Sequence, residues 1–296
     1  MSADIRRRLS GFIPAGVRAR VSPRLRARAR ALLGVEPWPD LAIRHPLFRE
    51  RRYRALRDQA RAFDASRFHK PVLERGHQAS YVIARWFEAA SVRAAFHIGY
   101  ANGRYLFYLS RVGIAGGGTD LPAAETAWVD MPAHVLDEAT RRRLLRVDFL
   151  DLGAADVQAV WSDAAPIDVF FSEATFETMI PWRDTPGASV PKYAGMTAGE
   201  RGMLLHERLP ARLAELQASF RNLVLIEPEP DAGGAGRVFR ACADRLPSLS
   251  YSVWRFRPPF DRLFRLSPSS PVRQVVYAYV RDESLTRALA EWAEPA

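Results

Sequence analysis

From about residue 93 onward, short apolar runs alternate with helical stretches, and this alternation constrains the fold more than any other feature of the sequence. The runs typical of buried strands are VRAAFHIG, IAGGGTDL, LLRVDFLDL, IDVFFSEA and NLVLIEP, and helical stretches such as GRYLFYLSRVG and GERGMLLHERLPARLAELQASF lie among them. Strands that alternate with helices form parallel sheets whose faces the helices cover. We therefore expect an α/β fold with a mostly parallel sheet.

The rhythm changes toward the C-terminus. Two further strand patterns, LSYSVWRFR and RQVVYAYVRD, are joined by a loop without a good helical pattern. Neighbouring strands that lack a helical crossover pair in antiparallel fashion. We expect a C-terminal antiparallel strand pair to close the sheet.

The N-terminal part of the chain has a different character. Helical patterns with polar faces cover residues 46–63 and 78–89, and a Pro-bearing break, EPWPD, precedes the first of them. We expect residues 1–65 to form a basic helical N-terminal extension and residues 66–296 to form the α/β domain.

The net charge of +10 is concentrated at the N-terminus, because residues 1–34 hold nine Arg and a single acid, Asp4. This segment is interpreted as a solvated or induced-fit arm, with peripheral contact to an anionic membrane as the second reading and a nucleic-acid arm as the third. Its Arg residues alternate along the chain and do not gather on one face of a helix. The sequence gives no strong nucleic-acid signal.

Cysteine and hydropathy patterns bear on the compartment. Cys242 is the only cysteine, so no intrachain disulfide and no Cys-based zinc site is expected. No apolar run reaches the roughly 18 residues that a spanning helix needs. We expect a cytoplasmic protein without a metal cofactor, and an organelle transit peptide at the Arg-rich start stays open as an alternative.

The stretch FHIGYANGRY, residues 96–105, predicts a strand that turns sharply into a helix. Gly99, Ala101 and Gly103 are small, so the backbone there can approach a ligand closely, although a tight connection alone would also need such residues. Ligands of open α/β sheets bind beyond the carboxyl ends of the strands, which is where this turn lies. The dinucleotide fingerprint G-x-G-x-x-G is not matched, because Ala101 and Arg104 stand where it needs Gly.

Instead, HIGYANG resembles the first motif of class I S-adenosylmethionine-dependent methyltransferases, an acid-x-Gly-x-Gly-x-Gly loop after a strand. The resemblance covers about residues 78–282. It implies a Rossmann-like class I methyltransferase fold with S-adenosylmethionine (SAM) as the cofactor, bound in part by Gly99, Ala101 and Gly103.

Three later stretches continue the resemblance. GGTDLP is similar to the second-strand motif of the family, which implies that Asp120, followed by Leu121, holds the ribose hydroxyls. RVDFLDL is similar to the third-strand motif, which implies adenine contacts for Asp148 and Phe149, with Asp151 as an alternative to Asp148. IDVFFSEATFETM looks like the fourth strand, whose end faces the reacting methyl group.

The sequence departs from the family pattern at two positions. Ala101 replaces the middle Gly, and His97 replaces the acid before the first Gly. The family's carboxylate helps to hold the cationic methionine end of SAM, and His97 does not supply that charge. A catalytically degenerate, methyltransferase-like binding or scaffold protein is therefore the alternative function.

The sequence-based hypothesis is transfer of a methyl group from SAM to oxygen of a small-molecule or glycan acceptor. A hydroxyl acceptor needs a nearby base, for which Glu173, His97 and His206 are the candidates. The Pro- and Gly-rich stretch IPWRDTPGASVPKYAGM, residues 180–196, is expected to cover the acceptor.

Overall fold

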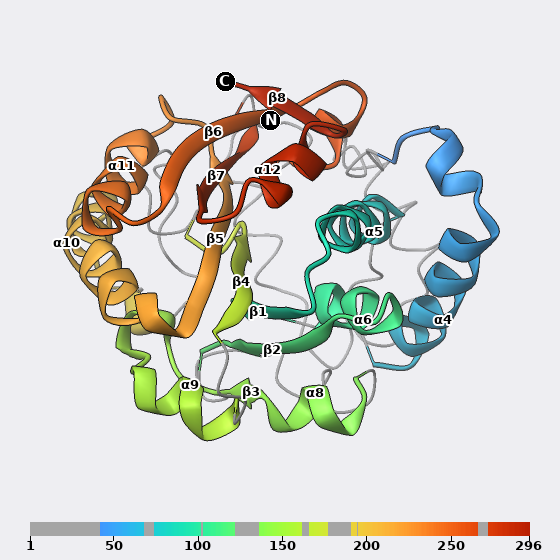
Figure 1. The fold of residues 1–296 in the computed structure, drawn as a ribbon, viewed down its shortest axis with the longest axis horizontal. Coiled ribbons are helices and arrows are strands. Elements are labelled where there is room, and N and C mark those ends of the chain that lie inside the picture. The colour runs from blue at the N-terminus through green and yellow to red at the C-terminus, as the bar shows by residue number, and fades with distance from the viewer. Residues whose placement is uncertain are drawn as a thin grey trace, which may run out of the picture.

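The computed structural model describes residues 42–67, 74–101, 103–121, 136–161, 166–176, 191–193, 195–265 and 272–296. A single eight-stranded sheet forms the centre of the molecule, and Figure 1 shows it running between two groups of helices. Its strands are β1 (Ala94–Ile98), β2 (Ala115–Thr119), β3 (Leu144–Leu145), β4 (Ile167–Glu173), β5 (Phe220–Pro228), β6 (Ser250–Phe256), β7 (Gln274–Val280) and β8 (Ala293–Pro295).

The strand order is β3-β2-β1-β4-β5-β7-β6-β8. Strands β1 to β5 pair in parallel, whereas β7 is antiparallel to both of its neighbours, β5 and β6. The predicted mostly parallel, Rossmann-like sheet with a C-terminal antiparallel strand pair is confirmed. The chain builds outward from β1 to β3 and then returns to place β4 beside β1, so the strand order reverses between β1 and β4. Ligands of such sheets bind at that reversal.

Helices cover both faces of the sheet. In Figure 1, one group lies on the right and contains α4 (Arg51–Arg67), α5 (Glu74–Ala89) and α6 (Arg104–Arg111), with α12 (Ser284–Leu289) above them. The other group lies on the left and consists of α9 (Ala154–Val160), α10 (Ala198–Glu215) and α11 (Ala235–Arg245). The short helix α8 (Glu138–Arg142) packs near β2.

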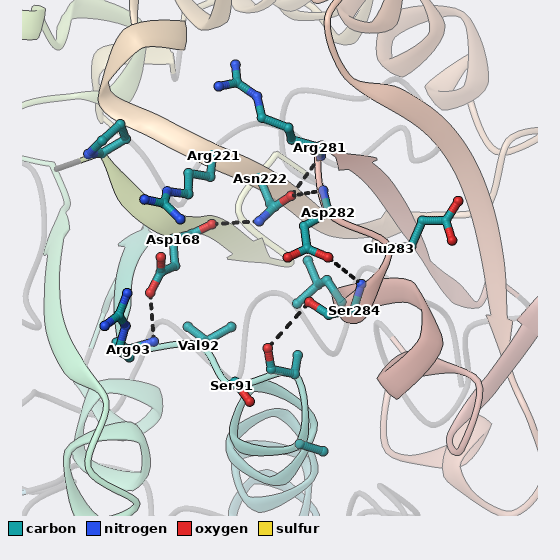
Figure 2. Close-up of a pocket in the computed structure, with 14 residues that line it drawn as sticks. Ser91, Val92, Arg93, Asp168, Arg221, Asn222, Arg281, Asp282, Glu283 and Ser284 are labelled. Carbon is teal, nitrogen blue, oxygen red and sulfur yellow. Dashed lines mark hydrogen bonds between the residues drawn. The ribbon is translucent and has the colours of Figure 1, made fainter.

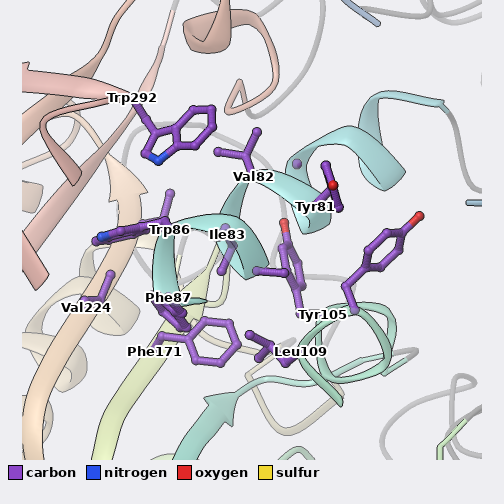
Figure 3. Close-up of a cluster of buried hydrophobic side chains, with 14 of the residues drawn as sticks. Tyr81, Val82, Ile83, Trp86, Phe87, Tyr105, Leu109, Phe171, Val224 and Trp292 are labelled. Atoms are coloured by element: carbon purple, nitrogen blue, oxygen red, sulfur yellow. The ribbon is translucent and has the colours of Figure 1, made fainter. Parts of the chain in front are cut away.

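Two apolar clusters, one on each face, hold these layers together. On the α5 side, Trp86 and Phe87 are buried against the sheet, and the Phe87 ring meets Phe171 of β4 edge-on at 5.3 Å (Figure 3). On the α10 side, Phe96 stacks on Phe170 at 4.6 Å. Each such side chain contributes about 1.5–3 kcal/mol by leaving water.

The described part of the N-terminal third belongs to this core. Ile43, Tyr53, Leu56 and Ala60 are buried in the same cluster as Phe171. The predicted helix at 46–63 is a short 3-10 helix at Pro46–Arg49 followed by α4. The division at residue 65 stays a prediction, and the Arg-rich residues 1–34 lie outside the described residues.

One predicted strand is shorter than expected. The stretch LLRVDFLDL forms only the two-residue strand β3 and then a 3-10 turn at Phe149–Asp151, because the Asp148 carboxylate accepts a hydrogen bond from the Leu150 N–H and starts the turn. Helices α11 and α12 and strand β8 were not among the predicted elements. None of the described helices is long and apolar enough to span a bilayer.

Candidate active site

The turn after β1 contains residues in the left-handed backbone conformation, as its small residues suggest. Gly99, Ala101 and Gly103 have φ angles of 72°, 44° and 72°, in the left-handed region that favours glycine. The N–H groups of Gly99 and Tyr100 both donate to the Thr119 carbonyl at the end of β2, at 2.8 and 3.3 Å. The turn is therefore tied to the neighbouring strand before α6 begins.

A second turn, after β4, packs directly against the first. A Cβ atom on Gly99 would lie 2.6 Å from the Thr175 hydroxyl oxygen, so only glycine fits there. That hydroxyl donates to the Ile98 carbonyl at 2.8 Å. Ala174, just before Thr175, also has a positive φ, of 54°. The hydrogen bond from Thr175 and its close fit against Gly99 fix the carboxyl ends of β1 and β4 relative to each other.

Asp120 follows β2 and faces the first turn. Its carboxylate accepts hydrogen bonds from the Ala101 N–H at 2.5 Å and from the Leu121 N–H at 2.7 Å. Burial raises the pKa of Asp120 above its ordinary value, and these two backbone bonds oppose the rise. One bond to each oxygen leaves further lone pairs free, and two hydroxyls of a vicinal diol are donors of the right number to meet them.

Glu227 on β5 holds the turn after β4 by hydrogen bonds. It is fully buried, and it accepts hydrogen bonds from the Ser172 hydroxyl at 2.8 Å, from the Thr175 N–H at 3.0 Å and from the Phe176 N–H at 3.2 Å. Sequence reasoning missed this residue because it lies within an apolar run that predicts a strand and nothing more.

Asp148 is already bonded within the protein. One carboxylate oxygen accepts from the Leu150 N–H at 3.0 Å, and the other accepts from the Lys192 ammonium at 2.7 Å and from the Tyr193 hydroxyl. Lys192 also bonds Asp151 at 2.5 Å. We call Asp148, Asp151, Lys192 and Tyr193 the β3 cluster. Of the predicted covering loop, residues 191–193, 195 and 196 belong to the described part of the chain.

Phe149 is buried beside this cluster. Its ring lies 6.0 Å from that of Phe176, which follows β4. The adenine contacts predicted for Asp148 and Phe149 stay predictions, and the structure places both residues at the carboxyl edge, next to the end of β2.

His97 lies inside the sheet core rather than at its surface. Its ring stacks on Phe171 at 4.3 Å and meets Tyr105 edge-on at 5.2 Å. Neither ring nitrogen has a hydrogen-bond partner among the described residues. Burial, together with the positive charge of Arg104, lowers the pKa of His97 to about 3. The imidazole is therefore neutral at physiological pH.

Of the other two candidate bases, Glu173 lies at the site and His206 lies elsewhere. Glu173 is the last residue of β4 and is half-buried, and its charge adds to the rise that burial causes in the pKa of Tyr105. His206 is exposed on α10 and lines a groove of about 300 Å³ with Met203 and Arg237. No other predicted site residue lines that groove.

A larger hollow, of about 970 Å³, lies at the opposite edge of the sheet (Figure 2). It is lined by polar groups that mainly serve the backbone: Asp168 accepts from the N–H groups of Arg93 and Ala94 at 2.7 and 3.1 Å. Asn222 likewise links β4 and β7 by bonding the Asp168 carbonyl and the Arg281 N–H at 3.0 and 2.9 Å. Its size alone does not make it the functional site, because these contacts hold strand ends together.

The structure thus brings the first turn, Asp120, Leu121 and Glu173 to the carboxyl ends of β1, β2 and β4. Within the described ranges, no group of three or more His, Cys, Asp or Glu is placed to hold a metal ion.

Comparison with known proteins finds similarity in structure only. No protein-family model matches the sequence, and no curated protein matches it. Among solved structures, the magnesium protoporphyrin IX methyltransferase ChlM from Synechocystis PCC 6803, with bound SAM, is 13% identical; the match covers 83% of this chain and 99% of that one, with a TM-score of 0.41. An O-methyltransferase from Bacillus cereus in complex with SAH is 13% identical over 78% of this chain and 91% of its own, with a TM-score of 0.39.

The bifunctional kinase-methyltransferase WbdD is also similar, at 13% identity and a TM-score of 0.41. The match covers 69% of this chain but only 39% of WbdD. With TM-scores below 0.5, these similarities carry no conclusion about activity or cofactor, for which the geometry of the site is the basis.

Proposed function

We propose that this protein is a SAM-dependent methyltransferase. The observation that carries the proposal is the pairing of two features at the strand-order reversal: a turn with left-handed residues at 99, 101 and 103, and the Asp120 carboxylate bonded to the middle of that turn. The turn brings backbone close to a ligand, and the adjacent carboxylate suits a ribose diol. Both features coincide with the sequence motifs that resemble the methyltransferase family.

The proposed acceptor is a hydroxyl group of a small molecule or glycan. Glu173 is the only one of the three candidate bases that lies half-buried at the carboxyl end of β4, whereas His97 is buried and His206 lines a separate groove. Transfer of a methyl group from a sulfonium needs little covalent help from a protein. Alignment of the acceptor oxygen with the methyl carbon supplies much of the rate.

The alternative is a protein that keeps the fold but does not catalyse, acting as a binding or scaffold partner. The neutral, buried His97 supports it, because no negative charge stands at that position. The two candidates differ in one measurable property, which is the affinity for SAM.

Titration of Asp120→Asn with SAM tests the proposal. The substitution removes the charge and keeps one acceptor oxygen, so we expect the affinity for SAM to fall roughly 30- to 100-fold while the fold remains intact. Asp168→Asn is the matched control, because Asp168 also accepts two backbone N–H groups, at the opposite edge of the same sheet. Equal affinities of both variants and the wild type would remove Asp120 from the cofactor site.

A further inference from the structure

Two charged side chains of opposite sign, Arg104 and Glu173, lie on the same side of the sheet near its carboxyl edge. The sequence did not predict that they act together. Strand β1 pairs with β4 so that His97 lies opposite Phe171, and their rings stack. Side chains two residues apart on a strand share a face, so Glu173 lies on the same face as His97, one step nearer the carboxyl edge. Helices α5 and α6 cover that face.

Arg104, the first residue of α6, lies on the same side of the sheet as Glu173. Its guanidinium donates from Nε to the Ser80 hydroxyl of α5 at 2.8 Å and lies over the Tyr105 ring, 5.2 Å from the ring centre. The Tyr105 ring meets Phe171, two residues before Glu173 on β4, edge-on at 6.2 Å. Burial raises the pKa of Tyr105 above its ordinary value, the charge of Glu173 adds to this rise, and the charge of Arg104 opposes it. Tyr105 is buried, whereas Arg104 and Glu173 are each half-buried. A positive and a negative group thus act on the same buried Tyr105 hydroxyl, and both retain contact with solvent.

A fixed guanidinium next to a fixed carboxylate is complementary to a zwitterion. An α-amino acid carries a carboxylate and an ammonium on one carbon, and each would find its opposite here; a ligand with one charge would leave the other side chain unpaired. SAM ends in such an α-amino acid. We propose that Arg104 binds the carboxylate and Glu173 the ammonium of the amino-acid end of SAM; this inference rests on the proposed function.

This assignment also accounts for His97. The position that holds an acid in the family motif is His97 here, buried between Phe171 and Tyr105. Its neutral ring packs there without a hydrogen-bond partner among the described residues. The negative charge comes instead from the neighbouring strand, through Glu173. Glu173 then acts in cofactor binding, in place of the role of base for which the sequence made it a candidate, and Tyr105 and Ser80 are positioning residues.

The test compares ligands with and without the amino-acid end. The full chain and its Glu173→Gln and Arg104→Gln variants are titrated with SAM, S-adenosylhomocysteine and 5′-methylthioadenosine, which lacks the amino-acid group. We expect each variant to lose roughly ten- to hundredfold in affinity for the first two ligands and less than about threefold for the third. Glu88→Gln is the control, because Glu88 pairs with Arg52 and Arg85 away from the site, and it should bind all three ligands as the wild type does.

The outcomes separate the inference from the function on which it rests. If the wild type binds SAM and both folded variants bind it equally well, the amino-acid site is wrong and the methyltransferase proposal stands. Equal losses for all three ligands would also overturn it, because they indicate a general disturbance of the turn. If the wild type binds none of the three, the proposed function itself fails. Should Glu173→Gln not fold, Arg104→Gln and Arg104→Lys decide the matter, with Lys expected to recover part of the affinity.

Discussion

Two acids at neighbouring strand ends, Asp120 after β2 and Asp148 after β3, have the same appearance in the sequence and different surroundings in the structure. Asp120 accepts two backbone N–H groups and keeps further acceptor capacity toward the turn. Asp148 is buried and bonds three donors, among them the Lys192 ammonium and the Tyr193 hydroxyl. An acid at the end of a strand can therefore bind a ligand or stabilise the fold. The hydrogen-bond donors that the protein itself places around the carboxylate determine which of the two it does.

The largest effect is expected from a substitution that disrupts the turn that Asp120 faces. In Gly99→Ala the new Cβ combines an unfavourable φ of 72° with an approach of 2.6 Å to the Thr175 side chain, so we expect a loss of about 4 kcal/mol in the free energy of unfolding. Gly113→Ala is the matched control, because Gly113 has a φ of 84° and nothing within 4 Å of a built Cβ. It should cost about 1 kcal/mol in urea unfolding. Equal costs would show that Thr175 does not restrict the turn.

The next largest effect is expected from a substitution that disrupts the β3 cluster. Asp148→Ala leaves the Tyr193 hydroxyl and the Lys192 ammonium without their shared acceptor, so we expect a loss of about 3 kcal/mol in stability. Asp151→Ala removes only exposed ion pairs and should cost less than about 1 kcal/mol. Urea unfolding measures both variants.

The same Asp148→Ala protein sharpens the comparison when it is titrated with SAM. If Asp148 serves the fold, its affinity for SAM should stay within about threefold of the wild type. A tenfold or greater loss in a folded variant would instead support the adenine contact that the sequence predicts.

A smaller effect concerns His97, whose pKa is lowered to about 3. In the unfolded chain His97 takes up a proton below about pH 6.5, whereas in the folded chain it stays neutral. The residue therefore lowers the free energy of unfolding as the pH falls from about 6.5 toward 3. In His97→Leu this part of the acid sensitivity disappears. Between pH 7.5 and pH 5 we expect the wild type to lose about 2 kcal/mol more than the variant.

The matched control for that experiment is His206→Gln, which removes an exposed imidazole instead of a buried one. Urea unfolding at the two pH values measures all three proteins. Parallel curves for the wild type and His97→Leu would mean that the folded protein protonates His97 normally.

The smallest effect relaxes the turn. Ala101 has a φ of 44° where the family motif has glycine. In Ala101→Gly the relief of left-handed strain exceeds the entropy that glycine adds to the unfolded chain, so a gain of about 0.5 kcal/mol is expected. A loss of stability on thermal unfolding would show that Ala101 fits its conformation without strain.

The sequence predicted the fold well because buried parallel strands are recorded in local apolar runs. Strands β1, β2, β4, β6 and β7 lie within the stretches that indicated them, and β5 begins two residues before its stretch, at Phe220. Helix α11 escaped prediction although it has apolar residues at Val238, Phe239 and Cys242, which form a short stripe among charged neighbours.

The site was harder to predict because its contacts join distant parts of the chain. Asp148 meets Lys192 across 44 positions, and Ser172 meets Glu227 across 55. Arg104 and Glu173 reach the same side of the sheet only through the register of β1 on β4 and the start of α6. A single sequence shows that these residues are polar, but not which of them face one another. The roles of Glu173, His97 and His206 as bases stay predictions.

The most direct test of the central claim is calorimetric titration of the wild-type chain with SAM and S-adenosylhomocysteine. The account predicts saturable binding of both ligands in the micromolar range, which Asp120→Asn weakens and Asp168→Asn does not. A folded protein that releases or absorbs no heat of binding with either ligand would contradict it, and would leave the turn after β1 as part of a fold that serves another role.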